Sequence, residues 1–95
     1  DYAGRTALMY AASGPFAPTV NLLIDRGADP NIRDREEGFT ALMFAAAEGR
    51  TKVVKALLAH NADMAIKDKD GDTALDFAVK NGHQDAARVL KNGRE

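Results

Sequence analysis

The chain has 95 residues, enough for one domain with a single continuous core. Hydrophobic residues make up 45% of it and charged residues 28%, which is typical of a globular protein. The net charge of −1 gives no electrostatic reason to expect a nucleic acid or an anionic membrane as the partner.

Two absences in the sequence exclude further classes of protein. There is no cysteine, which excludes disulfides, thiolate catalysis and zinc–thiolate sites. No apolar run approaches the length of a membrane span, and no secretory leader is visible. We therefore expect no membrane partner. A cytoplasmic location is favoured, although the composition does not fix the compartment.

The motif Thr-Ala-Leu begins at Thr6, Thr40 and Thr73, which gives a period of roughly 33 to 34 residues. Such a period is typical of stacked helical repeats, in which one unit is too small to bury its own apolar faces. We therefore predict one domain over residues 1–95. It is made of three units, which span residues 1–33, 34–67 and 68–95.

In the first unit, Thr6 is expected to cap a helix over about residues 7–13. Pro18 suits the first turn of a second helix over about residues 18–26, because its missing N–H costs little there. Gly27 is expected to end that helix. Phe16, in the link, either plugs the gap between the helices or stands exposed as an anchor. The residues expected to be buried in the second helix are Val20, Leu22, Leu23 and Ile24.

The connection from the first unit to the second runs from Ala28 to Phe39. Its segment Asp34-Arg35-Glu36-Glu37-Gly38 has one residue more between Asp and Gly than Asp68-Lys69-Asp70-Gly71 in the next connection. An extra residue in a surface turn costs little free energy. We expect a longer fingertip here, and two interpretations stay open: a neutral insertion, or a tip specific to a partner.

The second unit is the most regular and should be the most deeply buried. Thr40 is a good N-cap, and Gly49 and Asn61 can take the left-handed conformation that ends a helix. Apolar residues follow at helical spacing on both expected helices. They are Leu42, Ala45 and Ala46 on the first helix, and Val53, Val54, Leu57 and Leu58 on the second.

The third unit has smaller or charged residues where the second has large apolar ones. The residues Ala86, Ala87 and Lys91 replace Val53, Val54 and Leu58. Such a change suits the last unit of a stack, so we expect a C-terminal cap. The first unit shows no such change although the chain starts at Asp1. We therefore expect a fragment of a longer array, or a first unit that self-associates through its uncovered face.

The pattern Gly-x-Thr-Ala-Leu-x-x-Ala, followed by a glycine turn, an apolar helix and Gly/Asn-Ala-Asp, resembles the ankyrin repeat over the whole chain. The resemblance implies an all-α solenoid of three stacked helix-turn-helix units with protruding hairpin-like loops. It also implies a non-catalytic module that binds another protein through the concave groove of fingertips and first helices. Met9, Met43 and Asp76 replace the family's first-helix histidine, so we expect different polar contacts between repeats, with the methionines packing on apolar surface.

By the same resemblance, the partner-binding residues lie at the fingertips and on the first helices. Phe39 is expected to be the strongest anchor, since the family's residue at that position points outward. The aromatic residues Tyr10, Phe44 and Phe77 recur at one helix position, and they either pack between repeats or form a ladder open to the groove. Acidic fingertips favour a partner with basic residues and an apolar knob. The predicted set is Tyr2, Ala3, Arg5, Ser13, Arg35, Glu36, Glu37, Phe39, Phe44, Ala47, Glu48, Lys69, Asp70, Asp72, Phe77, Lys80 and Asn81.

Motifs with metal-binding or catalytic potential are weak. The acids between Asp68 and Asp72 alternate, but Thr73 and Val79 stand where a calcium loop needs Gly and Glu. Neither histidine has a Cys, a Ser or a second His at useful spacing, so we expect no metal site, cofactor or catalytic triad. The competing functional class is a structural spacer or cap of a larger protein, without a partner of its own.

Overall fold

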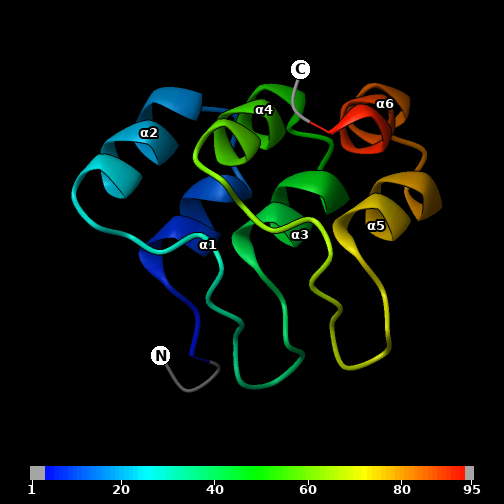
Figure 1. Cartoon of the computed structure of the whole chain (residues 1–95), viewed down its shortest axis with the longest axis horizontal. Coiled ribbons are helices and arrows are strands. Elements are labelled where there is room, and N and C mark those ends of the chain that lie inside the picture. Colours follow the sequence, from blue (N-terminus) through cyan, green and yellow to red (C-terminus); the bar gives the residue numbers. More distant parts are fainter. Residues whose placement is uncertain (1–3, 94–95) are drawn as a thin grey trace.

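The computed structural model describes residues 4–93, and this part of the chain contains six α-helices and no strand. Figure 1 shows two layers, with α1, α3 and α5 in one and α2, α4 and α6 in the other. Consecutive helices form three pairs, and the predicted all-α architecture is confirmed. The helices are α1 (Ala7–Ala12), α2 (Ala17–Asp25), α3 (Ala41–Ala47), α4 (Thr51–Ala59), α5 (Ala74–Lys80) and α6 (Gln84–Asn92).

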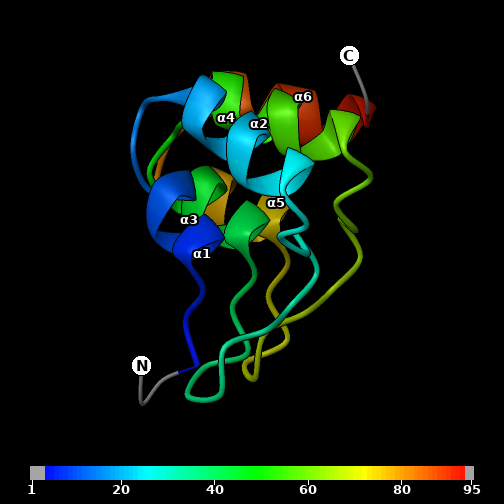
Figure 2. The same cartoon turned by 90° about the vertical axis from the view of Figure 1, so that its left-hand side faces the viewer.

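Long loops connect one helix pair to the next. Figure 2 shows that they project from the same side of the molecule, beyond the layer of α1, α3 and α5. We call residues 28–39 finger 1 and residues 62–72 finger 2. The fingers and the first helices of the pairs, α1, α3 and α5, together form one surface, which we call the finger surface. The predicted binding site lies on it.

Each helix of the α1, α3 and α5 layer begins at a threonine that caps it. The Oγ1 atoms of Thr6, Thr40 and Thr73 accept hydrogen bonds from the N–H three residues further on, at 3.2, 3.3 and 3.3 Å. The cap predicted at Thr40 is therefore confirmed. At Thr73 the bonding is reciprocal, because the Asp76 carboxylate accepts from the Thr73 N–H at 2.9 Å. That bond favours the charged form and holds the pKa of Asp76 below its ordinary value.

Residues with positive φ end the helices where the sequence predicted them. The φ angles of Gly27, Gly49 and Asn61 are 101°, 69° and 67°. The left-handed residue lets the following N–H turn back to the last helical turn, as in the Ala62 N–H to Leu57 carbonyl bond of 3.0 Å. The three predicted left-handed stops are confirmed.

The core lies between the two layers and continues from pair to pair. In one layer α3 packs between α1 and α5, and in the other α4 packs between α2 and α6. The central pair is the most deeply buried, as predicted, because it has a neighbour on both sides. Its predicted apolar faces are buried throughout: Leu42, Ala45, Ala46, Val53, Val54, Leu57 and Leu58. Met9 and Met43 are buried too, so these methionines pack on apolar surface as expected.

The first pair is less buried than its sequence predicted. On α2 only Val20 is buried, whereas Leu23 and Ile24 are half-buried and Leu22 is 48% exposed. Its main helix contacts are with α1 and α4 alone, and these two neighbours do not cover all of its large apolar side chains. The helix α6 also has two helix neighbours, but it carries the small Ala86 and Ala87 and the charged Lys91. Phe16 is 68% exposed, so of its two interpretations the plug between helices is wrong and the exposed position is confirmed, while its role as an anchor stays a prediction. It is the extended N-cap residue of α2, where the chain runs over the surface.

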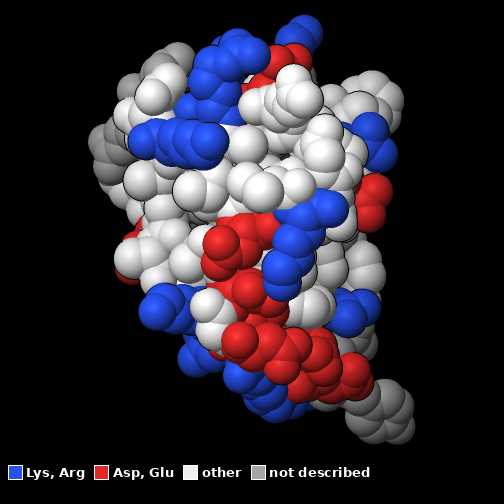
Figure 3. Space-filling model, turned by 90° about the vertical axis from the view of Figure 1, so that its right-hand side faces the viewer, with Lys and Arg blue, Asp and Glu red and all other residues white. Residues whose placement is uncertain are grey.

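The last pair presents a mixed surface at its end of the stack (Figure 3). Ala86 and Ala87 are buried and Lys91 is exposed, so only the charged residue of the predicted cap set faces solvent. Val79, which is 57% exposed, lines a hollow of about 470 Å³ between α5 and α6. The cap-like role of this pair therefore stays a prediction.

The unequal packing of α4 and α6 should be measurable. Leu57 lies on α4, which packs against α2, α3 and α6, whereas Leu90 lies on α6, which packs against α4 and α5. Leu57→Ala should lower the free energy of unfolding by about 2–5 kcal/mol, and Leu90→Ala should lower it less. Urea unfolding followed by circular dichroism measures both variants. Equal shifts of the two midpoints would show that the last pair is packed as tightly as the central one.

Gly49 and Gly82 occupy the same place in successive helix pairs. Substituting each of them distinguishes the cost of backbone strain from the cost of a steric contact. Gly49 and Gly82 have φ of 69° and 75°. A Cβ at Gly49 would come within 2.5 Å of the His83 ring, whereas a Cβ at Gly82 would meet nothing within 4 Å. Gly82→Ala should therefore cost only the left-handed strain of about 1–2 kcal/mol, and Gly49→Ala should cost more because the imidazole must move. Thermal unfolding decides this, and a smaller loss for Gly49→Ala would rule out the contact.

Candidate protein-interaction surface

A buried aspartate closes the turn of each finger. The Asp34 carboxylate accepts hydrogen bonds from the N–H groups of Glu37 and Phe39 at 3.1 and 3.0 Å, and the Asp34 N–H donates to the Phe39 carbonyl at 2.8 Å. In finger 2, Asp68 makes both kinds of bond to Asp72, at 2.9 Å each. The same pattern of hydrogen bonds thus closes a turn with one residue more in finger 1 than in finger 2. The predicted longer fingertip is confirmed.

Arg5 completes the surroundings of Asp34. Its Nε lies 3.3 Å from Asp34 Oδ2, and the Asp34 side chain is fully buried. Burial alone would raise the pKa of Asp34, but the N–H groups of Phe39 and Glu37 and the Arg5 side chain outweigh it, so the pKa is lowered. The Arg5 guanidinium also lies over the Phe44 ring, 5.5 Å from its centroid. One cation therefore connects the first pair both to finger 1 and to α3.

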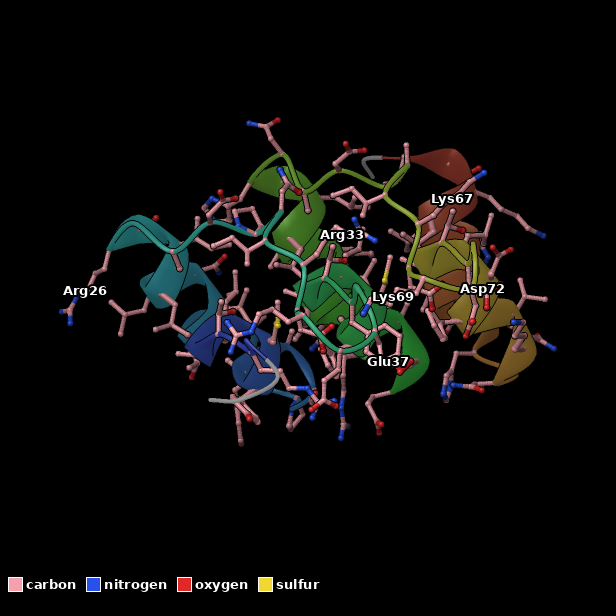
Figure 4. The ribbon with its side chains drawn as sticks, turned by 90° about the horizontal axis from the view of Figure 1, so that it is seen from below. Arg26, Arg33, Glu37, Lys67, Lys69 and Asp72 are labelled. Carbon is pink, nitrogen blue, oxygen red and sulfur yellow. The ribbon has the colours of Figure 1, made fainter. Side chains whose placement is uncertain are left out.

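The two fingers are joined at their tips (Figure 4). The Lys69 N–H donates to the Glu37 carbonyl at 2.9 Å, and Lys69 Nζ donates to the Arg35 carbonyl at 2.7 Å. The side chains of Arg35, Glu36, Glu37, Lys69 and Asp70 are all exposed. Five of the predicted site residues therefore lie at the two fingertips, which hydrogen bonds join to each other.

Phe39 is half-buried between two other phenylalanines, so the prediction that it projects outward is wrong. Its ring centroid lies 5.5 Å from that of Phe44 and 5.6 Å from that of Phe77, with interplanar angles of 85° and 89°. These edge-to-face contacts are a geometry that aromatic pairs prefer. Tyr10, at the corresponding helix position of the first pair, is 57% exposed. The recurring aromatics thus pack between pairs at Phe44 and Phe77, whereas the Tyr10 side chain is largely exposed.

The three phenylalanines border a pocket of about 190 Å³ beside α3. We call it the phenylalanine pocket, and its lining residues are Phe39, Met43, Phe44, Ala47, Glu48 and Phe77. Five of these are apolar, and the exposed Glu48 is the exception. The sequence prediction did not include Met43 among the binding residues. A methionine at helical spacing is ordinarily a core residue, and its sequence context does not distinguish a core position from one that lines a pocket.

Side chains from each pair bind carbonyl groups at the end of the preceding first helix. Arg50 Nε donates to the Ser13 carbonyl at 2.8 Å. Asn81 Nδ2 donates to the Ala47 carbonyl at 2.9 Å, and His83 Nε2 lies 3.0 Å from the same oxygen. Ser13 and Asn81, both predicted to bind a partner, are thus engaged within the stack. The bonds to Ala47 hold one wall of the phenylalanine pocket in place.

Two cations of this surface, Lys80 and Arg5, are paired with carboxylates. Lys80 Nζ lies 2.7 Å from Asp72 Oδ2, and this hydrogen bond holds the pKa of Lys80 above its ordinary value. Arg5 is paired with Asp34. Among residues 4–93, the Glu48 carboxylate has no cationic partner. Figure 3 shows acidic side chains gathered toward the fingers at this end of the molecule.

The structure places the predicted residues in three positions. Arg5 and the residues Phe39, Phe44, Ala47, Glu48 and Phe77 lie around the phenylalanine pocket. Others lie at the fingertips or at the helix ends described above, and Tyr2 and Ala3 lie outside the described residues. The sequence prediction missed Asp34, which organises finger 1. The sequence did carry a signal for this role, because an aspartate recurs a few residues before a turn glycine in both connections, as Asp34 and as Asp68.

In the part of the chain that the structure describes, no group of three or more His, Cys, Asp or Glu side chains is placed to hold a metal ion. His60 Nε2 lies 3.1 Å from Asn21 Oδ1, which gives that histidine a partner within the second-helix layer. No helix among residues 4–93 combines the length and the apolar composition needed to cross a bilayer.

The charge of Asp34 should contribute to stability in a pH-dependent way. Asp34→Asn keeps one acceptor oxygen but removes the charge, and hydrogen bonds to charged groups contribute about 1.5–3 kcal/mol, so a loss of that order is expected at pH 7. Because the folded pKa is lowered, the contribution is present above about pH 4 and disappears as the pH falls through the folded pKa. Urea unfolding at several pH values should show the difference shrinking on acidification. The exposed Asp25→Asn is the control, and a loss independent of pH would exclude the charge as its cause.

Comparison with known proteins agrees with this architecture. A family model of ankyrin repeats in three copies matches residues 8–95. No curated protein matches the sequence. The match extends from α1 through α6 and includes both fingers. With three stacked helix pairs and fingers that project from one side, the chain belongs to the ankyrin-repeat family.

Proposed function

We propose that this chain binds another protein through its fingers and first helices and has no catalytic activity of its own. Ankyrin repeats are generally protein-interaction modules and are typically non-catalytic. The observation that carries the proposal is the phenylalanine pocket, an apolar hollow with an unpaired carboxylate at its edge. Aromatic residues are enriched at the buried centres of interfaces, and polar residues form their rims.

The rigidity of the surface supports the same proposal. Finger 1 is closed by Asp34 and joined to finger 2 through Lys69, and Ala47 is held by Asn81 and His83. A surface that is already ordered loses little conformational entropy on binding. The fingers can therefore present their exposed side chains to a partner in a fixed arrangement.

The environment of the two histidines favours binding over catalysis. His83 lies against the Ala47 carbonyl and His60 against the Asn21 side chain, so both rings have structural partners. A general base needs a nucleophile or a substrate proton within hydrogen-bond reach. Neither of these two hydrogen bonds involves a hydroxyl or thiol nucleophile.

The second candidate function is a structural spacer or cap within a larger protein. The exposed Phe16, Leu22 and Val79 favour it, together with the hollow between α5 and α6, because they lie on the first and last pairs of the stack. Such side chains suit contacts with further repeats. In a spacer, the ends of the stack would carry the contacts and the finger surface would carry none.

A pull-down from a cell lysate distinguishes the two functions. The double variant Glu48→Ala with Lys80→Ala removes one carboxylate and one ammonium from the finger surface. Asp25→Ala with Lys55→Ala removes the same charges from exposed positions of α2 and α4. We expect proteins captured by the wild type to be lost with the first variant and kept with the second, since truncation of a binding centre typically costs about 1 kcal/mol or more.

Quantitative mass spectrometry measures the captured proteins, and circular dichroism checks that both variants are folded. Equal capture by the two double variants would remove the finger surface as the binding site. The absence of any specifically captured protein with the wild type would support the spacer.

A further inference from the structure

The size of the phenylalanine pocket limits what it can hold. Its volume is about 190 Å³. A cavity of about 150 Å³ lined by Leu, Ile and Phe accepts one benzene molecule. The pocket is therefore of a size that takes one apolar side chain such as leucine, methionine or phenylalanine.

The walls of the pocket come from three separate segments that are fixed relative to one another. Phe39 belongs to finger 1, Phe44 and Ala47 to α3, and Phe77 to α5. Ring contacts hold the phenylalanines, the Arg5 guanidinium lies over the Phe44 ring, and Asn81 and His83 bind the Ala47 carbonyl. Met43, the remaining apolar wall, can adapt its shape because its side chain is unbranched and flexible.

The charge beside the pocket that remains available for pairing with a partner is negative. The Arg5 guanidinium, which lies over the Phe44 ring, is already paired with Asp34, and Lys80 on α5 is paired with Asp72. The exposed Glu48 carboxylate lines the pocket and has no cationic partner within the described chain. A partner that brings a cation beside its apolar group would gain a charge pair, and one that brings an anion would be repelled.

We infer that the phenylalanine pocket binds one apolar side chain, leucine, methionine or phenylalanine, from a protein segment that carries a lysine or arginine beside it. The apolar group fills the pocket and the cation pairs with Glu48. This inference rests on the proposed function, because it names the chemistry that the finger surface recognises. It excludes acidic segments and nucleic acids from the same site.

The first experiment selects binders without assuming a natural partner. A phage-displayed library of random peptides is panned on the intact chain. We expect the selected sequences to be enriched in Leu, Met or Phe next to Lys or Arg. Synthetic peptides with the commonest sequences are then measured by isothermal titration calorimetry.

Two matched pairs of variants test where these peptides bind. Ala47→Met fills the pocket from its wall, and Ala59→Met adds the same side chain at an exposed position of α4. Glu48→Lys reverses the charge at the pocket, and Asp25→Lys makes the same change on α2. Ala47→Met and Glu48→Lys should each weaken binding by about tenfold or more, whereas the two controls should leave the dissociation constant unchanged. Circular dichroism confirms that all four variants fold.

A charge exchange distinguishes recognition from a general loss of structure. Replacing the basic residue of the peptide by Glu should weaken binding to the wild type and restore binding to Glu48→Lys. Peptides that respond to Glu48→Ala with Lys80→Ala but not to Ala47→Met would overturn this inference and leave the proposed function standing. If no selected peptide binds to the finger surface, both this inference and the proposed function are contradicted. A change in self-association of Ala47→Met, seen by light scattering, would make a second copy of the chain the occupant and overturn the inference.

Discussion

Burial between helix pairs is the interaction on which the structure depends. The helices are 6 to 9 residues long, and helices shorter than about 12–15 residues are marginal alone in water. Each pair therefore takes its stability from its neighbours. Alanines on the facing sides of α3 and α5 let the helices approach closely, and Val53, Val54, Leu57 and Leu58 fill the layer formed by the second helices. At the first pair, α2 has a packed neighbour on one side only and carries more large apolar side chains than its neighbours cover.

Close stacking also determines where polar groups find partners. A helix end leaves carbonyl groups that need donors. Here the donors come from the following pair, as Arg50 supplies one to Ser13, and Asn81 supplies one to Ala47. Each buried finger aspartate likewise satisfies N–H groups of its own turn. The polar contacts and the apolar core therefore reinforce the same spacing between pairs.

The same spacing creates the candidate site. Phe39, Phe44 and Phe77 come from a finger and two different helices, and they meet only because the pairs are stacked in register. The three rings are only partly buried, and they line an apolar hollow beside Glu48. Stability and recognition thus depend on the same interface. A change that loosens the stack would also alter the shape of the pocket.

The sequence by itself determined the repeat period, the threonine caps, the left-handed stops and the buried faces of α3 and α4. These features depend on residues within a few positions of one another, so local chemistry predicts them. Only the tertiary structure decided the exposure of Phe16 and Leu22 and the inward turn of Phe39. The exposure of a side chain depends on which helix lies across from it. The ring of Phe39 buries apolar area by packing between Phe44 and Phe77, and no residue near it in the sequence reveals that both neighbours are there.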